Sequence, residues 1–178
     1  MTAVAGLYEA RAKEQYVVFT LRSTRFAVPI LQVLRIIRQL PMTQVPRAPD
    51  FLEGVINDQG QVVPVVDLRK RLGLHEPGPP AAPSTSEDGG RILILELPPT
   101  SAAGEQRVGL LVDAVIGIVR IADSDIQPPP PMVAQVNGVY LTGVAQQDEA
   151  LVMVLNPERV LTVDEVAQVS RWYERGDV

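Results

Sequence analysis

The sequence predicts a mainly β protein built from two similar small β units. Short runs of β-branched and aliphatic residues alternate with turn-forming residues, as is typical of strands joined by tight turns. Residues 54–67 (GVINDQGQVVPVVD) and residues 143–156 (GVAQQDEALVMVLN) share glycine and valine positions without gaps. Residues 75–90 lie between these segments and are rich in proline, glycine, serine and alanine. Each unit is expected to close into a barrel, because closure removes exposed strand edges.

A second pair of similar segments, or echo, also supports two units. Residues 25–37 (RFAVPILQVLRII) and residues 107–119 (RVGLLVDAVIGIV) carry Arg, Val and Ile at matching places. Both echoes occur in the same order on either side of residues 75–90. The sequence therefore predicts a first unit over about 15–74, a linker or mobile loop over 75–90, and a second unit over about 91–161.

In the first half, strands are expected over 16–21 and 26–28, around a polar turn. The apolar spacing of residues 30–40 fits a helix as well as a strand, and we expect one helical turn followed by a strand over 34–38. A hairpin follows over 54–68, with Gly60 supplying a positive φ in its turn. Pro64 cannot donate to a ladder, so that strand is expected at an edge or beside a bulge.

In the second half, a strand is expected over 91–97, with Ile92, Ile94 and Glu96 on one face and Leu93, Leu95 and Leu97 on the other. The segments after it are a loop over 98–105, a β run over 108–121, an extended proline run over 128–131 and a hairpin from 139–144 to 151–155. The ends are expected to be an N-terminal arm or short helix over 1–14 and a C-terminal helix over 162–178, whose Thr162 and Glu165 have capping-box spacing.

The residues expected of an active site are scarce. The chain has no cysteine, and its single histidine, His75, falls in the linker. No glycine-rich phosphate loop occurs, and Asp123-Ser124-Asp125 is expected to form a turn and not a cation site. Asp58 is expected in a hairpin turn, and Asp67 is expected to accept backbone N–H bonds after its strand. We therefore predict no catalytic residues, no metal and no cofactor.

Charge and hydropathy narrow the possible partners. The chain carries 16 Lys+Arg and 21 Asp+Glu, a net charge of −5, which disfavours binding to nucleic acid or anionic membrane. The run Arg69-Lys70-Arg71 is interpreted as a solvated helix end. The N-terminal residues lack a signal-like apolar run and no segment is long enough to span a bilayer, which predicts a soluble, cytoplasmic protein without membrane insertion.

Several motifs in order resemble the CheW-type family of coupling proteins. The resemblance runs from about Gln15 to Leu161 and is carried most by residues 49–57 (PDFLEGVIN) and 60–69 (GQVVPVVDLR). Residues 109–115 (GLLVDAV), 140–143 (YLTG) and 155–161 (LNPERVL) match the family's second half.

This resemblance implies two intertwined five-stranded SH3-like barrels and a non-catalytic adaptor, monomeric when free, that couples chemoreceptors to a CheA-type histidine kinase. The implied partners are the regulatory domain of that kinase and the cytoplasmic tip of a methyl-accepting chemoreceptor, so the protein would be recruited to receptor arrays. By position, the implied receptor-contact residues are Asn57, Asp58, Gln59, Gly60, Val112 and Val115. The implied kinase-contact residues are Val33, Arg35 and Ile37.

The sequence departs from the family pattern in two places. The hairpin turn is Asn57-Asp58-Gln59-Gly60, where family members commonly have Asn-Leu-Arg-Gly with the arginine associated with receptor contact. Arg35 occupies a position where glutamate is common. We expect Asp58 and Gln59 to weaken binding of an acidic receptor tip. Two alternatives stay open: a CheW-like scaffold of a non-flagellar pathway (pilus or second-messenger), and an enzyme on a barrel scaffold with its site around Asp58 or Asp123.

Overall fold

A computed structural model describes residues 13–74, 89–100, 104–131 and 140–160 of the chain. Most of these residues form strands, joined by short turns and single turns of helix. The elements are β1 (Lys13–Leu21), β2 (Thr24–Pro29), the 3-10 turn η1 (Ile30–Gln32), β3 (Val33–Arg38), β4 (Leu52–Asp58), β5 (Gln61–Asp67), the helix α2 (Leu68–Arg71), β6 (Arg91–Thr100), β7 (Gly104–Val112), β8 (Ala114–Ala122), η2 (Asp123–Asp125), β9 (Ile126–Gln127), β10 (Leu141–Gln147), β11 (Ala150–Leu155) and η3 (Pro157–Arg159).

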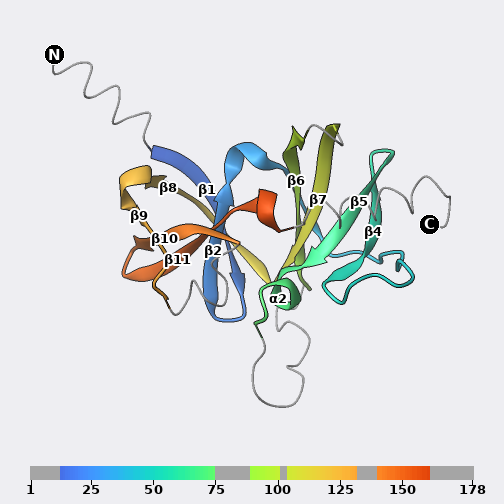
Figure 1. The fold of residues 1–178 in the computed structure, drawn as a ribbon, viewed down its shortest axis with the longest axis horizontal. Helices are drawn as coiled ribbons and strands as arrows, with labels where there is room; N and C mark the ends of the chain where they lie inside the picture. The colour runs from blue at the N-terminus through green and yellow to red at the C-terminus, as the bar shows by residue number, and fades with distance from the viewer. Residues whose placement is uncertain (1–12, 75–88, 101–103, 132–139, 161–178) are drawn as a thin grey trace.

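The strands form two sheets that lie side by side (Figure 1). The first sheet has the order β8-β1-β2-β11-β10-β9 and the second has the order β3-β6-β7-β5-β4. Each sheet therefore combines strands from both halves of the chain. The predicted mainly β, intertwined architecture is confirmed, although the two-residue strand β9 gives the first sheet a sixth member. The division at residues 75–90 does not separate the sheets, because β1 and β2 pair with second-half strands.

The sequence echoes correspond to repeated structure. The hairpin of β4 and β5 and the hairpin of β10 and β11 are antiparallel, and each has a register shift at its first glycine, Gly54 or Gly143. Strand β5 then pairs in parallel with β7, as β11 does with β2. After each hairpin a side chain caps a short turn, since Asp67 accepts from the Arg69 N–H and Asn156 accepts from the Glu158 N–H. The two halves thus form the same unit and exchange strands.

Gly143 is required at its position by a close backbone approach. A Cβ there would lie 2.5 Å from the carbonyl oxygen of Gln127 and 2.5 Å from Cγ2 of Ile126. We expect Gly143→Ala to lower the free energy of unfolding by about 1–3 kcal/mol, because β9 and β10 must move apart. Urea denaturation measures this change, with Gly117→Ala as the matched control, since a Cβ at Gly117 meets nothing within 4 Å. Equal stability of the two variants would contradict the prediction.

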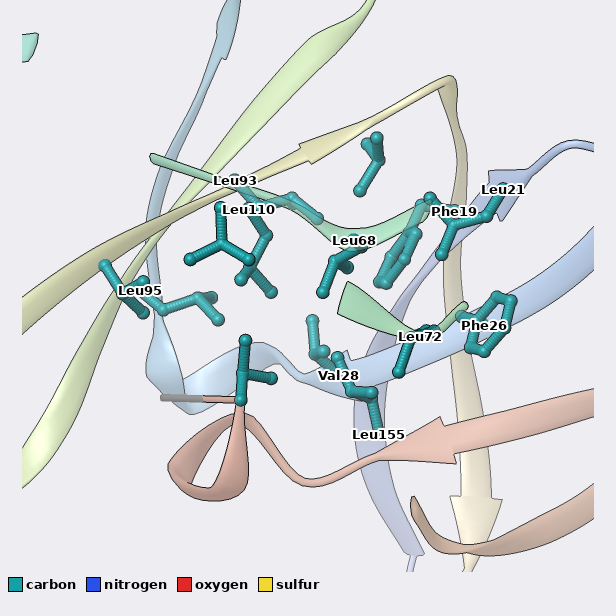
Figure 2. Packing of buried hydrophobic residues seen from close by; sticks show 14 of the residues in the cluster. Phe19, Leu21, Phe26, Val28, Leu68, Leu72, Leu93, Leu95, Leu110 and Leu155 are labelled. Carbon is teal, nitrogen blue, oxygen red and sulfur yellow. The ribbon is translucent and has the colours of Figure 1, made fainter. Parts of the chain in front are cut away.

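The largest hydrophobic cluster lies between the two sheets (Figure 2). This central cluster takes residues from both halves of the chain, and its largest fully buried members include Phe19, Leu21, Phe26, Leu68, Leu72, Leu93, Leu95, Leu110 and Leu155. A smaller cluster around Tyr16, Val18 and Val152 belongs to the first sheet, and another around Ile56, Val63 and Ile94 belongs to the second. Because the central cluster joins both sheets, the sheets form one cooperative body.

Strand β6 shows how the sequence encodes this arrangement. Its Ile92 and Ile94 pack in the second-sheet cluster, while Leu93, Leu95 and Leu97 pack in the central cluster. Both predicted faces of the strand are confirmed, and both are buried. A strand covered on both sides is apolar at nearly every position instead of alternating.

Other element predictions are confirmed or corrected. The helical turn and strand expected within residues 30–40 are η1 and β3. In the proline run at 128–131, Pro129 is half-buried and the other three residues are exposed. Strand β1 begins at Lys13 and β6 continues to Thr100, so residues 13–14 of the expected arm and 98–100 of the expected loop belong to strands. The rest of the arm, residues 1–12, lies outside the described residues. Strand pairing with β8 and β7 extends these elements beyond their apolar runs. The linker from residue 75 to 88, with His75, and the C-terminal helix lie outside the described residues.

The run over 108–121 and the strand containing Pro64 also differ from expectation. The run is divided at Asp113 into β7 and β8, which belong to different sheets. Strand β5 lies inside the second sheet and not, as had been expected, at its edge. Its pairing with β7 begins only at Val65, and the bulge of β4 lies opposite the same residue. Pro64 is therefore accommodated just before the second ladder starts.

Candidate functional site

Strand β3 is an end strand of the second sheet, and its side chains alternate between the interior and the surface. The predicted kinase-contact residues Val33, Arg35 and Ile37 occupy the half-buried inward positions. The outward positions are Leu34 and Ile36, which are 38% and 42% exposed. We call Leu34 and Ile36 the β3 row. The predicted kinase-contact residues therefore lie on the opposite face of β3 from the β3 row, since successive strand residues point to opposite faces.

The β4–β5 turn projects at the end of its hairpin (Figure 1). Asn57 Oδ1 accepts a hydrogen bond from the Gly60 N–H at 2.9 Å, and Gln59 and Gly60 have φ values of 52° and 83°. Two successive positive φ values are typical of the turn type that best matches strand twist in hairpins. Asn57, Gln59 and Gly60 are exposed, whereas Asp58 is only 9% exposed. Asp58 therefore flanks the hairpin turn, as predicted, but its side chain is buried.

The side chain of Asp58 lies between two arginines. Arg35 Nη1 is 3.5 Å from Asp58 Oδ1, and Arg107 Nη1 is 3.8 Å from Asp58 Oδ2. Arg35 Nη2 also donates a hydrogen bond to Gln59 Oε1 at 2.9 Å. We call Arg35, Asp58, Gln59 and Arg107 the Arg35 clasp. The carboxylate of Asp58 is paired inside the protein, so the expected repulsion of an acidic partner by this residue lacks its physical basis.

The Arg35 clasp shows that the second sheet curves round on itself. Strands β3 and β4 are the two ends of the strand order, yet Arg35 of β3 reaches Asp58 and Gln59 at the end of β4. The structure thus brings the two family departures, Arg35 and Gln59, into direct contact. Arg35 and Gln59 are far apart in the sequence and become neighbours only because the sheet is curved. Their contact was therefore not predicted from the sequence.

The remaining predicted receptor-contact residues lie elsewhere. Val112 is 2% exposed and belongs to the central cluster, so it does not offer a surface contact. It lies five residues after Arg107 on β7, so its Cα is about 16 Å further along the strand than that of Arg107, at roughly 3.3 Å per residue. Val115 is half-buried against the central cluster at the start of β8. The predicted receptor set is therefore split between two parts of the molecule.

A second exposed apolar row lies on β8, an end strand of the first sheet. Ile116 and Ile118 are 52% and 58% exposed, and we call them the β8 row. The echo between residues 25–37 and 107–119 aligns Leu34 with Ile116 and Ile36 with Ile118. The two rows are therefore equivalent positions of the repeat. Neither row was predicted as such, although strand alternation applied to the echo would have found both.

The cationic run after β5 is engaged with the rest of the protein. Arg69 Nη1 is 3.5 Å from Asp113 Oδ1, and Lys70 Nζ donates to Glu53 Oε1 at 2.7 Å. Arg71 Nε donates to the Val160 carbonyl at 2.7 Å, and its guanidinium lies 4.0 Å from the centre of the Phe51 ring. The predicted solvated helix end is wrong for Arg69 and Arg71, because both tie α2 to segments distant in sequence.

Asp67 caps α2 from a buried position, accepting from the Arg69 N–H at 3.0 Å, as the sequence predicted. Burial raises the pKa of Asp67 above its ordinary value of 3.8, although the Arg69 charge and backbone N–H groups act in the opposite direction. A raised pKa means that folding favours the protonated form, so stability falls as pH rises above 3.8 and through the pKa of the folded state.

We expect Asp67→Asn to raise the melting temperature at pH 7 by a few degrees. Asparagine keeps the capping oxygen, as Asn156 does in the second half, without a buried charge. The advantage should shrink as the pH approaches 3.8, where the aspartate loses its charge in both states. Thermal denaturation between pH 4 and 7 measures this. A variant less stable than the wild type at pH 7 would show that the attraction of Arg69 outweighs desolvation.

In the part of the chain that the structure describes, no helix is long and apolar enough to cross a membrane. Within residues 13–74, 89–100, 104–131 and 140–160, no three acidic or imidazole side chains gather as they would around a metal ion. Asp123 and Asp125 form the exposed turn η2, in agreement with the sequence prediction of a turn.

The described chain forms an intertwined two-sheet β-domain. Its two halves repeat one unit and exchange strands, and an end strand of each sheet carries an exposed apolar row. The chain belongs to the family of the CheW-like domain, whose family model matches residues 15–165.

Known proteins resemble the chain over nearly its whole length. The chemotaxis protein CheW of Klebsiella aerogenes is 27% identical, over 95% of this chain and 94% of its own. The CheW of Bacillus subtilis is 30% identical, over 86% and 90%, and the protein FrzA of Myxococcus xanthus is 29% identical, over 92% and 94%. The crystal structure of the scaffolding protein TtCheW from Thermoanaerobacter tengcongensis has a TM-score of 0.70 and 30% identity, covering 85% of this chain and 90% of that one.

Proposed function

We propose that this protein is a non-catalytic adaptor that couples a chemoreceptor to a CheA-type histidine kinase. The observation that carries the proposal is the family match over residues 15–165, on a fold that presents the β3 row and the β8 row on two different sheets. A rigid body with two separate apolar faces suits a protein that holds two partners at once. Its place would be the cytoplasmic side of receptor arrays.

The kinase regulatory domain is proposed to dock on the β3 row. Leu34 and Ile36 stand on an end strand, flanked by the exposed apolar side chains of Leu31 and Leu40, which are 91% and 40% exposed. End strands with exposed apolar residues favour association with another β surface. The inward residues Val33 and Ile37 support the row from beneath, because they pack against the central and second-sheet clusters.

The receptor tip is proposed to contact the β4–β5 turn and the β8 row with Val115. The turn offers Asn57, Gln59 and the backbone of Gly60 as exposed polar groups. The β8 row offers the two isoleucines that a helical hairpin could cover with an apolar stripe. Separate substitutions in the turn and in the row would apportion the contact between them.

Calorimetric titration tests the proposal directly. The regulatory domain of the kinase and a receptor fragment containing the hairpin tip, both from the same genome, are titrated into the full chain. We expect each to bind with a dissociation constant below about 100 μM, a generous limit for transient signalling contacts. Absence of binding by either partner at that concentration would refute the adaptor function. A saturable thermal shift with a nucleotide or divalent ion would instead favour the enzyme reading.

A further inference from the structure

Arg71 of α2 contacts both halves of the chain where the two sheets meet (Figure 1). Its guanidinium lies 4.0 Å from the centre of the Phe51 ring, just before β4, and 5.2 Å from the centre of the Tyr140 ring, just before β10. Its Nε donates a hydrogen bond at 2.7 Å to the carbonyl oxygen of Val160, which follows η3. We call Arg71, Phe51, Tyr140 and Val160 the Arg71 bridge. The bridge connects the hairpin of the second sheet with the hairpin of the first.

The Arg71 bridge consists of two equivalent pairs of the repeat. Phe51 and Tyr140 each lie three residues before the first glycine of their hairpin. Their backbone carbonyls accept equivalent hydrogen bonds, both at 2.7 Å, from the N–H groups of the residues that cap α2 and η3. Arg71 and Val160 each lie four residues after those caps. Equivalent residues touch each other only near the axis that relates the two halves, so the bridge lies at that axis.

The Arg71 bridge adds directional contacts to the apolar packing of the central cluster, which consists of aliphatic and aromatic side chains. Apolar burial is non-directional, so it favours contact between the sheets without specifying one angle. A guanidinium is planar and its N–H groups point in fixed directions. Stacking on Phe51 and donating to Val160 are therefore both satisfied in one relative position of α2 and η3. Val160 is fully buried and Arg71 is half-buried, so breaking this hydrogen bond is costly.

We propose that Arg71 is a positioning residue that fixes the angle between the two sheets, and with it the directions in which the β3 row and the β8 row face. The consequence for the rows rests on the adaptor function proposed above. The two rows lie on end strands of different sheets, so rotation of one sheet against the other turns one docked partner relative to the other. Each partner then still binds its own row, but the receptor is no longer held where it controls the kinase.

Pulsed electron paramagnetic resonance on the full chain measures the angle. The chain has no cysteine, so Ile36→Cys and Ile118→Cys place one spin label on each row. With Arg71 present we expect one narrow distribution of distances between the labels. Arg71→Met keeps the length of the side chain without its donors. In this variant we expect the distribution to shift or broaden by about 2 Å or more, the size of displacement typical of packed elements that slide.

Lys70→Met is the matched control. Lys70 is the neighbouring cation of α2, and its Nζ donates to Glu53 of β4 at 2.7 Å, a contact within the second sheet. We expect the labelled Lys70→Met chain to keep the distance distribution of the labelled wild type. If Arg71→Met does not fold, judged by its melting transition, Tyr140→Leu takes its place. This variant removes one ring of the bridge and keeps an apolar side chain, and the same change in distance is expected.

A second measurement combines the unlabelled chain with the receptor fragment and the intact kinase. In Arg71→Met we expect the dissociation constant of each partner to stay within about twofold of the wild-type value. The change that the receptor causes in the rate of kinase autophosphorylation should fall by about fivefold or more. A residue that only stabilised the fold would, when replaced, weaken binding and control together.

The outcomes separate the two proposals. An unchanged distance distribution in both Arg71→Met and Tyr140→Leu would overturn the role of Arg71 and leave the adaptor function standing. An altered distribution with intact control of the kinase would refute the consequence for the docked partners. Failure of either partner to bind the wild type would remove the adaptor function, whereas the spin-label distances would still decide whether Arg71 fixes the angle.

Discussion

Replacing Phe26 by alanine is expected to lower the free energy of unfolding by about 3–5 kcal/mol, the usual cost of deleting a buried aromatic ring. Phe26 is 0% exposed and lies in the central cluster (Figure 2), where its ring stacks on Phe19 with centroids 6.1 Å apart. The cavity would open where the two sheets meet. Both sheets should therefore lose stability together.

Urea denaturation followed by circular dichroism and by the NMR amide signals of β1 and β5 measures the loss. We expect one transition with both probes, shifted to lower urea. Leu151→Ala is the control, because Leu151 is 64% exposed and its truncation should change stability by less than about 0.5 kcal/mol. Two separate transitions would indicate that the sheets unfold independently, against the shared core.

Ile36→Asp should weaken binding of the kinase regulatory domain at least about 30-fold, as expected for a residue at the centre of a docking surface. The change places a charge on the β3 row. Docking of an apolar partner surface would remove water from that charge, which costs free energy. Ile36 is already 42% exposed, so the folded protein should lose little stability. Calorimetry with the kinase domain measures the affinity, and thermal melting confirms the fold.

Ile118→Asp provides the reciprocal control. Ile118 holds the equivalent place on β8 and is 58% exposed. We expect this variant to bind the kinase domain normally and the receptor fragment weakly. If the two substitutions had the same effect on both partners, the assignment of the rows to different partners would be wrong.

Local features of the fold were predictable from the sequence because each has a local cause. The β4–β5 turn follows from Gly60, the turn η1 follows from Pro29 and the apolar spacing after it, and the capping role of Asp67 follows from its place after an apolar strand. The strand exchange had no local signal. Strand β3 pairs with β6 and β8 pairs with β1, and only packing in the central cluster decides those partners. The resemblance, not periodicity, implied the intertwining.

The candidate site residues were assigned from motif position, and the sequence did not give their exposure. The predicted kinase-contact residues of β3 face inward and Leu34 and Ile36 face outward, and the sequence could not separate the two faces because aliphatic residues occupy both. Arg35 and Gln59 were treated as separate departures, because their contact depends on the curvature of a whole sheet. Val112 lies in the segment 109–115 that resembles the family, but its side chain is buried in this protein. Motif position alone does not indicate exposure.

The strand exchange also governs how the chain can fold during synthesis. Strands β1 and β2 leave the ribosome early, yet β8 and β11 follow only from residues 114 and 150 onward. At roughly 5–20 residues per second, the nascent hairpin waits several seconds for these neighbours. During that delay, Val17 and Phe26 lack the second-half residues that bury them in the folded protein. A stalled or truncated product would therefore expose an apolar surface to which chaperones and proteases bind.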